Sequence, residues 1–118
     1  MSYDVSLRKC GQAIKVPLFS EGGTYAIGGS DEAWLNITYN YGRHIREALG
    51  FNLGRLDGMT AQAALPYLRK AVLRLGKERD EDYWAAKPGN AGYALSILLA
   101  WAEQAVVQGE GDAVFEVS

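Results

Sequence analysis

The sequence is poor in the residues that most often cross-link a protein or carry its chemistry. It contains one cysteine, Cys10, and one histidine, His44, among 118 residues. A single cysteine excludes an internal disulfide framework and is typical of a protein from a reducing cytoplasm. His44 has no HxxE, HxH or CxxC pattern around it, so the sequence predicts no metal site and no cofactor.

The chain also lacks a long hydrophobic run and a strong charge of either sign. No apolar stretch reaches membrane-spanning length, and residues 1–4 lack the charged and apolar regions of a signal peptide. The formal net charge of -2 does not favour wrapping of duplex nucleic acid through its phosphates. We therefore expect a cytoplasmic protein that binds neither a membrane nor duplex nucleic acid.

What is present indicates a globular domain. Hydrophobic residues make up 48% of the chain and charged residues 22%, both ordinary values. A chain of 118 residues can bury a working core without metal or disulfide, so we expect a single domain over residues 1–118.

Strands are expected first and helices later, with one strand returning at the end. The pattern predicts an α+β fold in which about three helices pack on one face of an antiparallel sheet of about four to five strands. Gly11 is expected in the turn of the first hairpin, and Asn40, Thr60 and Asn90 are expected to cap the helices. The expected strands are 3–8, 13–18, 24–27, 33–39 and 113–117, and the expected helices are 41–49, 61–75 and 91–108.

The run 32–41 indicates a strand with two specialised faces. Leu35, Ile37 and Tyr39 alternate with Trp34, Asn36, Thr38 and Asn40. A tryptophan beside two carboxamides offers a flat apolar surface with donors and acceptors, which suits a planar polar ligand. A strand covered by a helix or partner, with its carboxamides bonded to backbone, explains the pattern equally well. Because the side chains on both faces need packing or hydrogen-bond partners, we expect this strand to be interior to the sheet.

A second cluster lies between the second and third expected helices. Trp84 and Tyr93 could stack on a base, and Lys87 with the helix start at Asn90 could hold a phosphate. The alternative is a loop pinned to the core by Trp84, with ordinary start and stop signals around it.

Three further features favour an anion. Arg43 and His44 stand at the start of the first helix, where the helix dipole attracts negative charge. Thr24 and Tyr25 lie between the glycine pairs 22–23 and 28–29, whose N–H groups could approach a phosphate, although two hairpin turns explain the glycines as well. The basic series from Arg69 to Arg79 is interpreted as a solvated helix face.

Catalysis finds little support in the sequence. Ser20 and Ser30 lack a GxSxG context, the glycine pairs lack a Walker or dinucleotide fingerprint, and no spacing selects a pair of carboxylates.

The strings GGTYA (22–26) and EAWLNITYNY (32–41), together with the block 82–92, resemble a family of small uncharacterised proteins carried by phages and prophages. The resemblance spans nearly the whole chain. It implies a context, because phage proteins of this size are often accessory factors directed at the host, some of which sequester nucleotide signals of antiviral defence. It transfers no catalytic residue.

These features together predict a non-enzymatic protein that binds a nucleotide-like small molecule and sequesters it in the host cytoplasm. The alternatives are a module that inhibits a host protein and, third, a small nucleotide hydrolase. A second copy of the chain stays open as a partner. The residues predicted to form the ligand site are Trp34, Asn36, Thr38, Asn40, Arg43, His44, Thr24, Tyr25, Trp84, Lys87, Asn90 and Tyr93.

Overall fold

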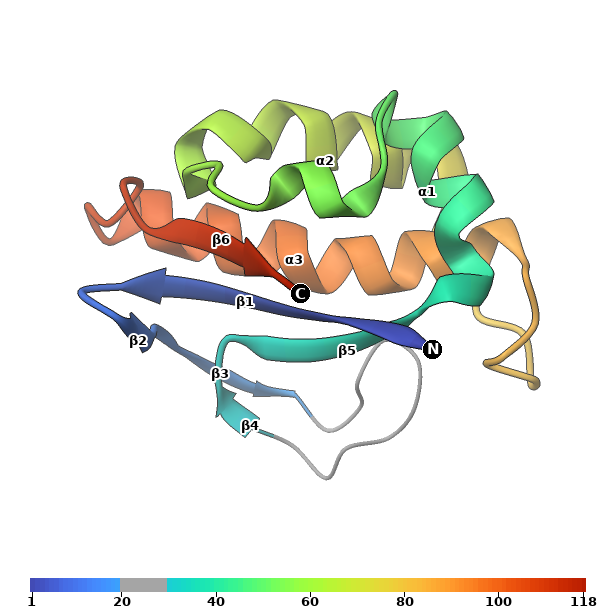
Figure 1. The fold of residues 1–118 in the computed structure, drawn as a ribbon, viewed down its shortest axis with the longest axis horizontal. Helices are drawn as coiled ribbons and strands as arrows, with labels where there is room; N and C mark the ends of the chain where they lie inside the picture. Colours follow the sequence, from blue (N-terminus) through green and yellow to red (C-terminus); the bar gives the residue numbers. More distant parts are fainter. Residues whose placement is uncertain (20–29) are drawn as a thin grey trace.

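The computed structural model describes residues 1–19 and 30–118. A four-stranded antiparallel sheet carries three α-helices on one face, which confirms the predicted α+β class (Figure 1). The glycine pairs 22–23 and 28–29, with Thr24, Tyr25 and the strand expected at 24–27, lie outside the described residues.

Strand β1 (Ser2–Lys9) is the centre of the sheet. Along one edge, the first part of β1 pairs with β5 (Trp34–Thr38) and its last two residues pair with the short β2 (Gln12–Ala13). The other edge of β1 pairs with β6 (Val114–Val117). The β1–β2 turn confirms the expected hairpin, because Gly11 has φ 78° and Cys10 has φ 55°. Two positive φ values in a two-residue turn match the right-handed twist of the strands.

The expected strand 13–18 is divided in two by a fork in the sheet. At Leu7, the N–H donates to the Ala33 carbonyl (3.1 Å) and the carbonyl accepts from the Ile14 N–H (2.9 Å). The Ala33 N–H donates to the Ile14 carbonyl at 3.0 Å, which completes the junction of these three residues. Beyond this junction β3 (Lys15–Phe19) leaves the main sheet and pairs with β4 (Ser30–Glu32) in a separate two-stranded ribbon.

The prediction that the strand after residue 32 is interior was wrong. Within the described residues β5 pairs with β1 alone, so it is an edge, and β1 is the strand paired on both sides.

The opposite edge of the sheet, on β6, is covered by the chain before α2. Phe115 exchanges backbone hydrogen bonds with Gly58 and Met59 (2.9 and 2.8 Å), and the Asp57 carboxylate accepts the Val117 N–H at 2.9 Å.

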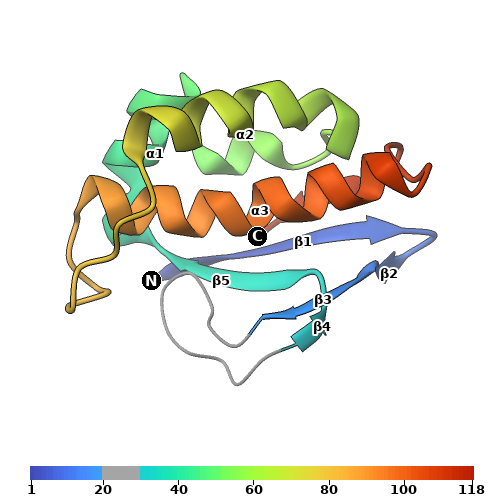
Figure 2. The same ribbon diagram turned by 180° about the vertical axis from the view of Figure 1, so that it is seen from behind.

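Helix α3 (Pro88–Val107) lies between the sheet and α2 (Ala61–Leu75) (Figures 1 and 2). Gly109 has φ 77°, and the Glu110 N–H donates to the Ala105 carbonyl at 2.7 Å, a Schellman ending of the helix. The expected cap of α3 was wrong, because the helix begins two residues before Asn90 and Lys87 occupies the cap position. Pro88 suits the first helical position, since the N–H it lacks would be unpaired there.

The remaining helix boundaries agree with the expected caps in part. Thr60 caps α2, its hydroxyl accepting from the Ala63 N–H at 3.1 Å. Helix α1 (Gly42–Leu49) ends at Gly50, which has φ 87°. Asn40 does not cap α1, because the short 3-10 turn η1 (Tyr39–Tyr41) precedes the helix and is capped by Thr38. A second 3-10 turn, η2 (Leu53–Leu56), leads toward α2.

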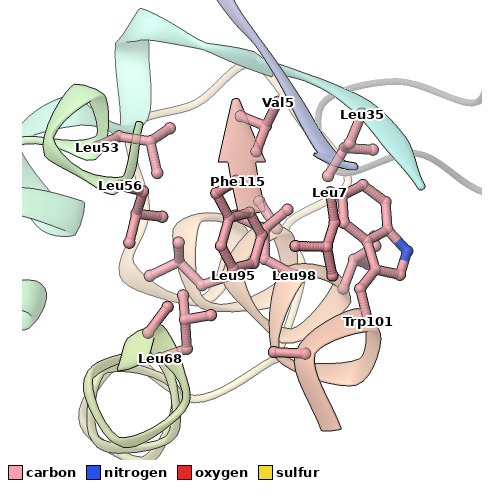
Figure 3. Close-up of a cluster of buried hydrophobic side chains, with 14 of the residues drawn as sticks. Val5, Leu7, Leu35, Leu53, Leu56, Leu68, Leu95, Leu98, Trp101 and Phe115 are labelled. Atoms are coloured by element: carbon pink, nitrogen blue, oxygen red, sulfur yellow. The ribbon is translucent and has the colours of Figure 1, made fainter. Parts of the chain in front are cut away.

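The core fills the space between the sheet and the helices (Figure 3). Leu7 and Phe115 from the sheet meet Leu95, Leu98 and Trp101 of α3 there. Each of these side chains is at most 2% exposed. Burial of such side chains stabilises the fold by roughly 1.5–3 kcal/mol apiece.

Truncation of α3 at the core should be costly. We expect Leu98→Ala to lower the free energy of unfolding by about 2–5 kcal/mol, because the side chain is fully buried and the site cannot collapse completely. Leu99→Ala, at a partly buried site, should cost less, and Leu73→Ala, at a site 82% exposed, should change stability by less than about 0.5 kcal/mol. Urea unfolding measures all three, and equal losses at positions 98 and 73 would contradict the described packing.

Candidate functional site

The chain between α2 and α3, residues 76–87, is fixed by the buried side chain of Asn90. Its Oδ1 accepts the Asp80 N–H at 2.8 Å, and its Nδ2 donates to the carbonyls of Asp82 (3.1 Å) and Ala85 (3.0 Å). Asn90 is 1% exposed, and both of its amide hydrogens are used in these bonds. Asn90 therefore orders this segment, which we call the α2–α3 loop, and does not face a ligand.

The start of α1 holds the same loop from the other side. Asn40 Nδ2 donates to the Trp84 carbonyl at 2.8 Å, and the Tyr41 hydroxyl donates to the Tyr83 carbonyl. His44 Nε2 lies 3.0 Å from the Ala86 carbonyl, so this nitrogen carries the hydrogen. The structure therefore brings together three of the predicted site residues, Asn40, His44 and Trp84. The contacts of Asn40 and His44 are hydrogen bonds to backbone carbonyls of the loop.

The tip of the loop presents aromatic rings on this ordered backbone. The rings of Tyr83 and Trp84 lie 5.3 Å apart and are 36% and 45% exposed. The Asp82 carboxylate accepts the Trp84 N–H at 3.1 Å, which fixes the turn that carries both rings.

A cavity of about 660 Å³ lies where the α2–α3 loop leaves α2 and enters α3. Lys77, Arg79 and Lys87 line it, and the first residues of α3, Pro88 and Gly89, form part of its wall. Glu78 and Asp80 also reach the lining, so the charges are mixed with an excess of cations. The positive end of the α3 dipole adds to that excess.

Two glycines allow the loop to cross the beginning of α3 at close range. A Cβ added to Gly89 would meet the Glu78 carbonyl oxygen at 1.8 Å, and one added to Gly92 would meet that of Gly76 at 1.7 Å. The wall of the cavity therefore depends on backbone contact that only glycine permits. Beside it, the Arg79 guanidinium lies 4.5 Å from the centre of the Tyr93 ring, a cation–π contact.

The other predicted site residues lie elsewhere. Trp34 is the first residue of β5, at the opposite end of that strand from η1 and α1, and it is 39% exposed. Asn36 Nδ2 donates to Ser2 Oγ (2.7 Å) and Asp4 Oδ1 (3.0 Å) across the strand pair. Thr38 is 3% exposed and its hydroxyl accepts the Asn40 N–H at 3.3 Å.

Arg43 also takes no part in the cavity. Its side chain lies on the exposed side of α1, where Nε meets Glu47 Oε1 at 3.2 Å. The expected site that joins the Trp34 face to the α3 N-terminus is thus not assembled among the described residues.

Sequence reasoning missed Lys77 and Arg79. Both were assigned to a solvated helix face, but α2 ends at Leu75 and both residues follow Gly76, which has φ 75°. The glycine was the available signal, because a left-handed residue at a helix end redirects the chain and the side chains after it.

No protein-family model matches the chain, and no curated protein and no solved structure shows significant similarity to it. Among the residues of 1–19 and 30–118, no group of histidine, cysteine and carboxylate side chains could hold a metal ion. In the same ranges no helix has both the length and the apolarity to cross a bilayer.

Removal of the Asn90 side chain should loosen the α2–α3 loop. We expect Asn90→Ala to cost roughly 2–4 kcal/mol of unfolding free energy, because three buried hydrogen bonds are lost at once. The Asp80 amide should also exchange its hydrogen faster. Asn52→Ala is the matched control, since Asn52 is exposed and its side chain makes no capping bond. An Asn90 variant as stable as the control would contradict the assigned role.

Tyr41 should make stability depend on alkaline pH. Burial raises the pKa of the Tyr41 phenol to about 12, with a smaller opposing effect of Arg79. The unfolded chain ionises Tyr41 near pH 10, so the stabilisation is complete below about pH 10 and is lost as the pH rises to about 12. Unfolding measured at about pH 9 and pH 11 should show a smaller decline for Tyr41→Phe than for the parent chain. Identical declines would show that the phenol is not buried as described.

Proposed function

We propose that this chain binds a small nucleotide-like anion in the cavity at the start of α3 and sequesters it without chemical change. The observation that carries the proposal is the meeting of Lys77, Arg79 and Lys87 around a hollow of about 660 Å³. This volume is in the range of small-molecule sites, and three cations with a helix N-terminus suit a phosphate.

The surroundings of the cavity supply the other half of a nucleotide site. Arg79 over the Tyr93 ring offers a flat, charged surface, and the Tyr83–Trp84 pair lies on the same loop. Bases stack on such surfaces regardless of their identity, at about 1–3 kcal/mol per base. The hydrogen bonds of Asn40, His44 and Asn90 hold the loop in place before binding, which lowers the entropy lost on capture.

The resemblance to phage proteins gives this activity its context. Capture of a nucleotide-derived signal in the host cytoplasm would keep the signal from its receptor, which requires affinity and no turnover. Inhibition of a host protein through the exposed Tyr83–Trp84 pair is the second candidate, because paired exposed aromatic rings are frequent hot spots of protein interfaces.

Calorimetric titration with cyclic dinucleotides, cyclic ADP-ribose isomers and mononucleotides tests the proposal. At least one ligand should bind, and Lys87→Ala and Arg79→Ala should each weaken it about tenfold through a lost charge-assisted hydrogen bond. Lys70→Ala, a lysine outside the cavity, should have no effect. Chromatography of the released ligand should recover it unchanged.

The variant Trp34→Ala distinguishes binding in the cavity from binding on the face of β5. Binding should survive it, because Trp34 lies away from the cavity. Loss of binding in Trp34→Ala with retention in Lys87→Ala would move the site to the sheet. Absence of heat with every nucleotide, or turnover of any of them, would contradict sequestration.

A further inference from the structure

Helix α2 carries an exposed stripe that neither the core nor the proposed nucleotide cavity uses. Pro66, Lys70, Leu73 and Arg74 are spaced by three or four residues and so share one face of the helix. Leu73 is 82% exposed on this face, and Tyr67, which follows Pro66 and precedes Lys70 by three residues, is 47% exposed. The exposed tyrosine and leucine lie on either side of Lys70 and form a candidate contact surface.

The stripe borders a hollow of about 330 Å³ between α2 and the end of α1. Ala48 and Leu49, both nearly buried, contribute apolar surface, and Pro66 and Tyr67 contribute more from the α2 side. The hollow is preformed, because Arg74 Nη1 donates to the Glu47 carbonyl at 3.0 Å and ties the two helices together. The Phe51 ring meets the Tyr67 ring edge-on at 5.4 Å and fixes its position.

The charge around the hollow has one predominant sign. Helix α2 contains Arg69, Lys70 and Arg74 and no acidic residue. Arg69 is paired with Glu103 at 3.6 Å, whereas Lys70 has no ion pair within the described part of the chain. Glu47 is the carboxylate of the lining, and Arg43 neutralises it at 3.2 Å. Lys70 and Arg74 therefore leave a positive flank beside an apolar hollow.

We infer that this surface docks an acidic polypeptide segment of a partner protein, which inserts one aromatic or aliphatic side chain into the hollow. The apolar lining and the small volume suit a single anchor residue, in the manner of a helix lying in a groove. Lys70 and Arg74 select carboxylates around that anchor, and Leu73 extends the apolar contact by one turn. The site is separate from the nucleotide cavity and shares no residue with it.

Selection from a displayed random library of about twelve residues, long enough for roughly three helical turns, tests this inference on the full chain. Enriched peptides should carry net negative charge and a Trp, Phe or Leu anchor. Fluorescence anisotropy with a labelled selected peptide should show at least tenfold weaker binding to Lys70→Glu and to Leu73→Ser. Binding should also fall steeply as salt screens the contact.

Two control variants make the same kinds of substitution at other places on the surface. Val107→Ser alters an equally exposed apolar residue, and Arg55→Glu reverses an exposed cation that does not line the hollow, so both should bind within twofold of the parent chain. Neutral or basic selected peptides, or equal loss in the controls, would overturn the inference. A greater affinity of the same face for anionic vesicles, an oligonucleotide or a second copy of the chain would overturn it too.

Discussion

The fold depends on the burial of α3 on two sides. The helix meets the sheet with Leu95, Leu98 and Trp101, and α2 covers its opposite side (Figures 2 and 3). A helix without a polar face cannot be stable at the surface, so both layers must form for it to be shielded from water. The position of α3 then decides where the α2–α3 loop crosses, and the loop in turn forms the cavity. The candidate site is therefore a product of core packing rather than of a local motif.

The loop shows how a polar segment is ordered without a core of its own. Asn90 satisfies three backbone groups of the loop from below, and Asn40, Tyr41 and His44 satisfy three more from the side. Each of these bonds joins a side chain on a well-packed element to the backbone of the loop. The backbone of the loop is thereby held in place by side chains that lie outside it.

The sequence predicted the fold class, because periodicity and capping act locally and most elements follow from them. Gly11, Gly50 and Thr60 act as local chemistry predicts. The errors came from contacts between distant segments. Asparagine is a residue type that often caps helices, but the Asn90 side chain hydrogen-bonds to the α2–α3 loop instead. Lys77 and Arg79 line a cavity that exists only when two chain segments meet. Such pairings are set by tertiary structure, and no spacing along the chain encodes them.

The junction of Leu7, Ile14 and Ala33 has a consequence for how this protein can vary. The chain leaves the main sheet after Ile14 and returns to it at Ala33, and these two residues are hydrogen-bonded to each other at 3.0 Å. The connection that includes the β3–β4 ribbon is thus an excursion with adjacent ends. The entropy of closing such an excursion changes slowly with its length, so segments of other lengths and sequences can be grafted at the same point. The β3–β4 ribbon can therefore be exchanged at this junction while the main sheet and its helices keep their packing.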